Sequence, residues 1–164
     1  MKHLNFSSSF SVLPNKSFCN IPPLLLLYTE KTSINYLSNI ILWNDLNLTS
    51  IYTFKDLIKT VPVQYIPIKQ TIKINFLDCT PDKITVYDSI LDYDGNLMYS
   101  QKETILSYLT PNNKMYEYIL PENVASLFSS QYKENKFDIR GITLKAFFEE
   151  NECDYIFLIK TDPL

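Results

Sequence analysis

The chain has 164 residues, of which 46% are hydrophobic and 20% charged, so it can bury a core and is not disordered. The net charge of −3 argues against a nucleic-acid partner, because phosphate contacts need clustered Lys and Arg. The two glycines and single histidine exclude glycine-rich phosphate loops and multi-histidine zinc sites. We therefore expect no cofactor, no metal and no enzyme activity. We also expect no membrane span, because no apolar run approaches about 18 residues.

Residues 1–22 differ in character from the rest of the chain. They contain the serine-rich stretch 7–11 and the prolines Pro14 and Pro22, with Pro23 directly after them, which favours a poorly ordered N-terminal arm. Residues 23–164 then form one domain. The arm lacks the continuous apolar run of a signal peptide. The location is therefore left open: extracellular or at the cell surface if a signal is missing from this sequence, and cytoplasmic otherwise.

From Leu24 onward, hydrophobic residues recur with a period of two, which predicts strands. In the clearest strand, 70–77, Ile72, Ile74 and Phe76 alternate with polar residues, as in a sheet with one solvated face. Further strands are expected at 24–28, 32–43, 83–91, 97–103, 104–109, 115–120, 137–148 and 153–161, with another strand pair beginning at Val63. Their spacing of roughly 8–12 residues is typical of a sandwich or barrel. Short helices are expected at 53–60 and 124–130.

The segment Asp92–Asn96 contains the sequence Asp-Gly, which predicts a hairpin turn between 83–91 and 97–103. A weak calcium site using Asp88, Asp92 and Asp94 is the alternative. The EF-hand pattern itself fails, because Ile90 and Gln101 stand where the loop needs its first and last acidic ligands.

The three cysteines, Cys19, Cys79 and Cys153, have no C-x-x-C spacing, so a zinc ribbon or a thioredoxin-type motif is excluded. We favour three free thiols. The alternative is a disulfide between Cys79 and Cys153, since both are expected at strand ends.

Four side chains stand out as candidate site residues. Trp43, the only tryptophan, is interpreted first as a core anchor and second as a platform for a sugar or peptide; Tyr93, in the predicted turn, is the other candidate ligand contact. Arg140 is the only arginine, and its planar guanidinium predicts a pair with a carboxylate on an adjacent strand. Asp154 is the preferred structural partner, with Asp138 as the other candidate. Gly141 suggests a bulge or the close approach of a neighbour.

Several short segments together resemble a known family: Ile84-Thr85-Val86-Tyr87-Asp88 followed by Gly95, Ile139-Arg140-Gly141-Ile142, Asn151–Phe157, and Ile159–Asp162. The chain is similar over roughly residues 22–162 to immunoglobulin-like β-sandwich domains at the ends of uncharacterised cell-surface lipoproteins of the Firmicutes, which are bacteria. The resemblance implies no catalytic residues. The chain departs from the family in lacking a lipobox.

We therefore predict an all-β fold: an antiparallel, immunoglobulin-like β-sandwich with one or two short helical turns. The alternative fold is a closed barrel of lipocalin size. The expected function is a non-enzymatic binding or accessory module of the cell surface that recognises a protein or glycan. One alternative is a cytoplasmic inhibitor or immunity-type protein that binds an enzyme. The other is a carboxylate-based hydrolase, for which Glu149, Glu150, Glu152 and Asp154 are available.

Overall fold

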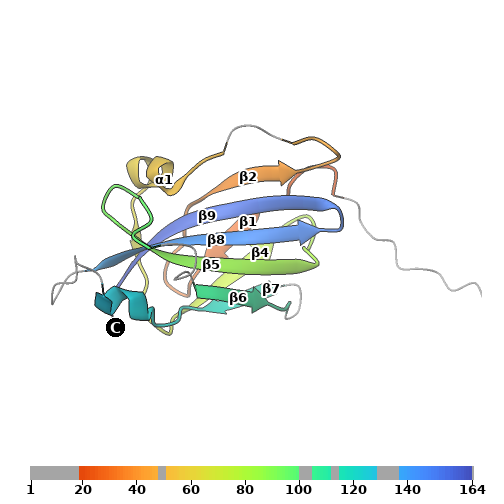
Figure 1. Cartoon of the computed structure of the whole chain (residues 1–164). Helices are drawn as coiled ribbons and strands as arrows, with labels where there is room; N and C mark the ends of the chain where they lie inside the picture. Colours follow the sequence, from red (N-terminus) through yellow and green to blue (C-terminus); the bar gives the residue numbers. More distant parts are fainter. Residues whose placement is uncertain (1–18, 48–50, 100–104, 112–114, 129–136, 164) are drawn as a thin grey trace, which may run out of the picture.

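A computed structural model describes residues 19–47, 51–99, 105–111, 115–128 and 137–163. It consists mostly of β-strands in two sheets, with one short α-helix, α1 (Phe54–Thr60), and a 3₁₀ helix at Val124–Phe128 (Figure 1). The strands are β1 (Leu25–Tyr28), β2 (Tyr36–Leu42), β3 (Gln64–Tyr65), β4 (Thr71–Phe76), β5 (Lys83–Leu91), β6 (Ile105–Leu109), β7 (Met115–Ile119), β8 (Asp138–Phe148) and β9 (Asn151–Thr161). Most of the predicted N-terminal arm, 1–22, lies outside the described residues.

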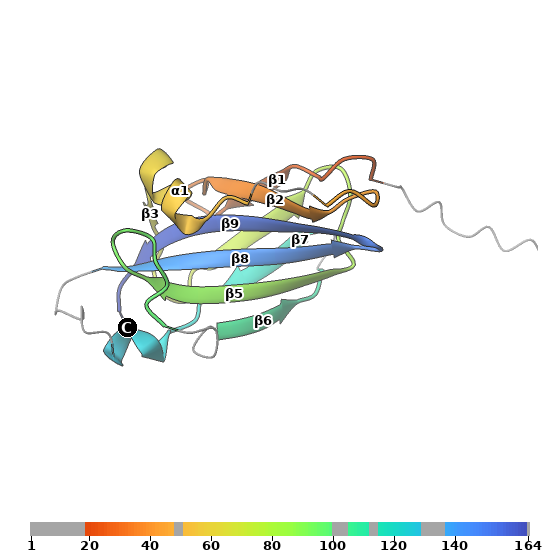
Figure 2. The same cartoon turned by 45° about the horizontal axis from the view of Figure 1, so that its top comes forward.

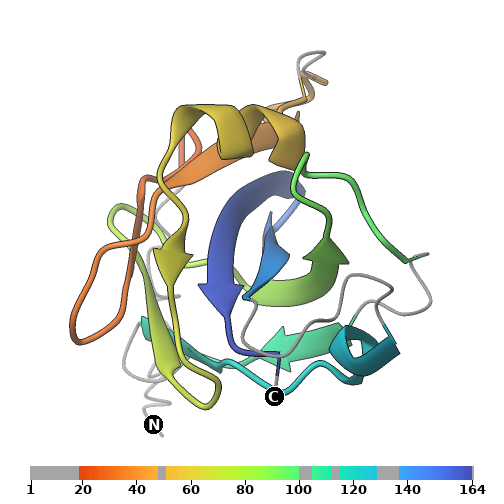
Figure 3. The same ribbon diagram turned by 90° about the vertical axis from the view of Figure 1, so that its left-hand side faces the viewer.

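The strands form two antiparallel sheets that face each other. The smaller sheet has the order β1-β4-β7, and the larger has the order β2-β9-β8-β5-β6, with β3 added in parallel along β9. Seen along the strands, the sheets enclose the core between them, and α1 lies outside the larger sheet (Figure 3). The predicted antiparallel sandwich is confirmed in this form.

The predicted turn after β5 forms, but the described residues that follow it are not a regular strand. We expected 97–103 to return along β5; Leu97 bridges Leu91, and the Met98 N–H donates to the Ile90 carbonyl at 3.1 Å. The strand that pairs with β5 is β6, in which Ile105 lies opposite Asp88. The connection is longer than a tight hairpin, so the Asp-Gly turn does not set the register of this pair. Residues 100–104 lie outside the described part of the chain.

The main core forms where the inward faces of the two sheets meet. Alternation places Ile72, Ile74 and Phe76 of β4 inward, where each is at most 5% exposed. The Phe76 ring makes edge-to-face contacts with the rings of Phe148 and Tyr155 in the larger sheet, at centroid distances of 5.8 and 5.5 Å. These contacts bury large apolar surfaces, which is the main stabilising term for a domain of this size.

A second, smaller core lies on the outer face of the larger sheet, beneath α1. Leu57 of α1 is fully buried there and packs with Ile156 and Leu158 of β9. Thr53 caps the start of the helix, and its backbone N–H donates a hydrogen bond of 2.7 Å to the Asp56 carboxylate. α1 therefore covers part of a sheet face that would otherwise be exposed. No helix among the described residues is long and apolar enough to cross a membrane.

The cysteine prediction is wrong. Cys19 forms a disulfide with Cys79, and Cys153 is free and buried on β9. Cys153 points into the core, where burial raises the pKa of its thiol to about 12. The bond ties the first described residue to the loop after β4, so this end of the N-terminal region is fixed to the domain.

Gly141 marks a close approach rather than a bulge, since the pairing of β8 with β5 and β9 is regular on both sides of it. A Cβ atom added at Gly141 would lie 2.8 Å from the Phe54 ring and 2.8 Å from Leu91 Cδ1. The missing side chain is what lets the first residue of α1 rest on β8.

We predict that Gly141→Ala lowers the free energy of unfolding by about 1–3 kcal/mol, because the added methyl group overpacks the contact with α1. The double variant Gly141→Ala/Phe54→Leu should recover part of this loss, because the smaller side chain makes room. Urea melts followed by circular dichroism measure both. An unchanged melt for Gly141→Ala would show that α1 shifts without cost.

Candidate functional site

The most strongly constrained polar group of the molecule is a buried ion pair between the sheets. Arg140 on β8 and Asp88 on β5 are both 0% exposed. Arg140 Nε donates to Asp88 Oδ1 at 2.9 Å, and Arg140 Nη2 donates to Asp88 Oδ2. This is a two-pronged contact that only the planar guanidinium can make.

The ion pair also joins the two sheets. The Tyr118 hydroxyl, on β7 of the smaller sheet, donates to Asp88 Oδ2 at 2.6 Å. Arg140 Nη1 donates at 2.7 Å to the carbonyl of Pro121, which follows β7. Burial, with the Asp88 carboxylate beside it, raises the pKa of Tyr118. Each of these donors has an acceptor at hydrogen-bonding distance, so the group of side chains links the two sheets.

The prediction that Arg140 pairs with a carboxylate on an adjacent strand is confirmed, but the preferred partner was wrong. Arg140 lies opposite Ile159 on β9, which places Asp154 five residues along the strand. An odd offset puts Asp154 on the other face of the sheet, because strand side chains alternate. Asp138 is bonded instead to Ser126, and burial raises the pKa of Asp138.

Asp154 belongs to a charged row on the outer face of the larger sheet. Lys145 Nζ lies 2.8 Å from Glu152 Oε1 and 3.7 Å from Asp154 Oδ2. Asp154 Oδ1 is buried without a hydrogen-bond partner. Burial raises the pKa of Asp154 to about 6. Of the other carboxylates considered for hydrolysis, Glu149 and Glu150 are exposed on the β8–β9 turn.

The two predicted ligand contacts lie in different surroundings. Trp43 is 5% exposed and packs edge-to-face on Phe148, with ring centroids 5.4 Å apart, which agrees with its interpretation as a core anchor. Tyr93 is 55% exposed in the loop after β5. The structure does not bring the two residues into one site.

The loop carrying Tyr93 is organised by its own side chains. Asp92 Oδ1 accepts hydrogen bonds from the backbone N–H groups of Asp94 and Asn96, at 2.9 and 2.8 Å, and Asp92 Oδ2 accepts one from Asn96 Nδ2. Asp88, the third expected calcium ligand, is held by Arg140 instead. Within the described ranges, no group of three or more His, Cys, Asp or Glu side chains is placed to hold a metal ion.

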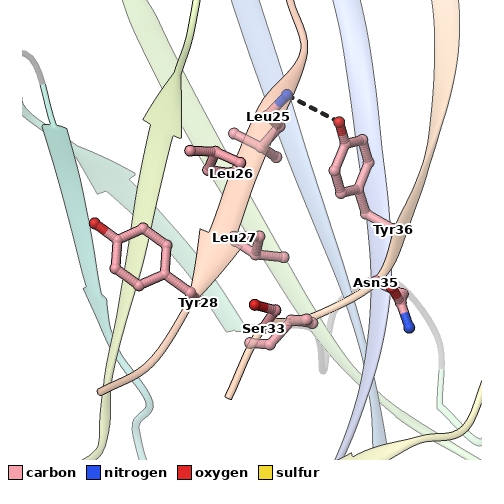
Figure 4. A pocket seen from close by; sticks show the side chains of 8 residues that line it. Leu25, Leu26, Leu27, Tyr28, Ser33, Asn35 and Tyr36 are labelled. Atoms are coloured by element: carbon pink, nitrogen blue, oxygen red, sulfur yellow. Dashed lines mark hydrogen bonds between the residues drawn. The ribbon is translucent and has the colours of Figure 1, made fainter. Parts of the chain in front are cut away.

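A groove opens between β1 and the segment leading into β2, where the edges of the two sheets diverge (Figure 4). Its volume is about 400 Å³, and its walls are Leu25, Leu26, Leu27, Tyr28, Ser33, Ile34, Asn35 and Tyr36. The Tyr36 hydroxyl accepts a hydrogen bond of 2.8 Å from the Leu25 N–H, and the Ile34 N–H donates one of 2.8 Å to the Leu27 carbonyl. These two bonds fix both ends of the groove.

The groove presents main-chain polar groups and hydroxyls beside apolar side chains. The Leu77 N–H bonds to the Leu24 carbonyl, so alternation directs the main-chain groups of Leu25 and Leu27 away from β4 and toward the groove. The lining residues offer apolar walls, main-chain polar groups and hydroxyls, and include no histidine or carboxylate. The Leu25 N–H and the Leu27 carbonyl are already bonded to Tyr36 and Ile34, so a ligand would meet the apolar side chains and the hydroxyls of the lining residues.

Sequence reasoning considered Asp88 only as a calcium ligand, and it did not single out Tyr118 or the groove. Asp88 did carry a signal: its position in 83–91 places it on the same face as Ile84, Val86 and Ile90, and a carboxylate on an apolar face needs a partner. The groove has no such signal, because it forms between strands of different sheets.

Comparisons of the chain with protein-family models, with curated proteins and with solved structures find no match.

We predict that Arg140→Met lowers the free energy of unfolding by about 3–5 kcal/mol, because Asp88 is left charged and buried without its partner. Replacing both residues, as Arg140→Met/Asp88→Leu, should recover most of that loss, since no charge is then buried. Urea melts of the two single variants and the double variant give the coupling energy. As a control, Lys69→Met removes an exposed pair with Glu122 and should cost less than about 1 kcal/mol. Losses of stability that simply add in the double variant would show that Arg140 and Asp88 do not stabilise each other.

We predict a pH effect from Asp154. Its pKa is raised from 3.8 to about 6, so between these values the folded chain binds more protons than the unfolded chain and stability falls as pH rises. Asp154→Asn removes this contribution and should be more stable than the wild type at pH 7, by an amount on the order of 1–3 kcal/mol, but not at pH 4. Urea melts at both pH values measure it, with the exposed Asp78→Asn as control. The same stability difference between Asp154→Asn and the wild type at pH 4 and pH 7 would contradict a raised pKa of Asp154.

Proposed function

We propose that this chain is a non-enzymatic binding module of the cell surface that recognises a protein or a glycan. The observation that carries the proposal is the β1–β2 groove, an open cleft of about 400 Å³ between the edges of two sheets, lined by both apolar and polar groups. Clefts that combine apolar walls with fixed polar groups are a common form of binding site. Leu24 and Leu26, at 64% and 47% exposed, extend the apolar surface beside it.

The order of the strands supports an immunoglobulin-like form of the sandwich. Immunoglobulin domains place strands A, B and E in one sheet and C, F and G in the other, with C′ added beside C in variable-type domains. Taking β1, β4 and β7 as A, B and E, and β5, β6, β8 and β9 as C, C′, F and G, reproduces both orders. Under this assignment β2, β3 and α1 lie between strands A and B. Such sandwiches commonly carry recognition functions, which is an argument by analogy of fold.

The disulfide between Cys19 and Cys79 supports the surface location. Disulfides form and persist in oxidising, extracytoplasmic compartments and are rare in the cytosol. This favours a surface module over the cytoplasmic inhibitor considered above.

The test is a binding screen of the purified oxidised protein against a random dodecapeptide display library and a glycan array. We expect at least one saturable ligand, and for a groove ligand we expect Ser33→Arg, which places a bulky side chain at the groove, to weaken binding about tenfold or more. Ser38→Arg, at an exposed position on β2, is the matched control. The proposal fails if no ligand emerges, or if hydrolase substrates are turned over and one carboxylate substitution abolishes that turnover.

A further inference from the structure

A second surface feature lies at the opposite end of β9 from the β8–β9 turn. Tyr65 on β3, Phe137 just before β8 and Asp162 just after β9 come together here, and we call them the aromatic–carboxylate cluster. β9 pairs with β3 on one side and with β8 on the other, so the three residues lie on or directly beside the ends of three neighbouring strands (Figure 2). Sequence analysis did not single out any of the three.

The cluster holds two aromatic rings in fixed positions at the surface. The rings of Tyr65 and Phe137 meet edge to face, with centroids 5.3 Å apart and planes at 61°. The Tyr65 hydroxyl donates to Asp162 Oδ2 at 2.5 Å, so this ring is held from two directions. Both rings remain exposed, Tyr65 by 44% and Phe137 by 52%.

Both a hydrogen-bond acceptor and a hydrogen-bond donor accompany these rings. The Asp162 carboxylate is exposed and offers about four acceptor positions, of which Tyr65 uses one. Lys160 lies opposite Tyr65 in the β3–β9 ladder, and cross-strand partners share a face, so its ammonium adds donors to the same surface. An exposed ring flanked by an acceptor and a donor is thus assembled without any rearrangement of the strands.

We infer that this cluster is a saccharide-binding site. A pyranose ring has an apolar face that packs on an aromatic ring, and its rim of hydroxyls both donates and accepts hydrogen bonds. Asp162 would accept from the hydroxyls and Lys160 would donate to them. Because the rings are already held in place, binding loses little side-chain entropy.

The charges around the cluster decide between ligand classes. A cationic side chain would gain from the rings and Asp162, but Lys160 places a positive charge beside the same rings. An acidic polysaccharide would face Asp162 and a net charge of −3. A neutral saccharide meets neither penalty. This inference rests on the proposed binding function and names the ligand class for one site.

The experiment titrates the oxidised protein with cellohexaose, chitohexaose and maltohexaose, following ¹H–¹⁵N NMR shifts. We expect at least one to bind, with a Kd on the order of 10 μM to 1 mM. Tyr65→Ala and Phe137→Ala should each weaken binding about tenfold or more, since each removes one ring. Tyr65→Phe keeps the ring and should retain most of the affinity, and Tyr52→Ala, 49% exposed before α1, is the matched control. Asp162→Asn, which keeps both rings, serves as a further variant if an alanine variant fails to fold.

The outcomes separate this inference from the proposed function. Saccharide binding unchanged by Tyr65→Ala and Phe137→Ala would overturn the site while the binding function stands. Absence of saccharide binding, with a peptide bound in the library screen, would overturn the ligand class alone. Failure of both screens would overturn both proposals.

Discussion

The fold depends on one buried ion pair. Arg140 and Asp88 lie between the sheets with no exposure to solvent, and their hydrogen bonds reach Tyr118 on β7 and the Pro121 carbonyl beyond it. Two buried charges are costly, and replacing such a pair by apolar side chains is often neutral or stabilising. Its value here is specificity: a slip of one residue in the β5–β8 register would move one charge to the outer face and leave the other unpaired in the core. The pair therefore selects one register and one docking of the two sheets.

The outer face of the larger sheet shows how this register determines the surface. With β8 placed by Arg140, Gly141 lies under Phe54 and gives α1 room to pack against Leu91. The helix covers an apolar part of the face, while the part nearer the β8–β9 turn carries the charged row around Lys145. The same arrangement brings Tyr65 and Phe137 together over the end of β9. One set of strand pairings thus places a covered region, a charged region and an exposed aromatic region on a single sheet.

Several contacts hold the β1 edge of the sandwich. β1 is held by the bonds from Leu25 to Tyr36 and from Ile34 to Leu27, and the disulfide of Cys19 with Cys79 fixes the chain ahead of it. Unpaired strand edges are sites of unwanted association, so these contacts protect the edge while leaving a groove beside it. The groove and the aromatic–carboxylate cluster are separate surfaces, since the one lies along β1 and the other beside the end of β9.

The period of the apolar residues by itself predicted a sandwich or barrel of strands, the inward faces of β4, β5, β8 and β9, and the short helix before β3, because burial of one face of a strand or helix leaves a local repeat in the sequence. The unusual single arginine likewise predicted a carboxylate partner on an adjacent strand. Its identity as Asp88 was decided by strand pairing, which brings residues 52 positions apart into contact. The disulfide partner of Cys79, the groove between β1 and β2, and the meeting of Tyr65 with Phe137 were also decided only in three dimensions. Each depends on which strands become neighbours, and strand order is set by packing of the whole chain rather than by any local segment.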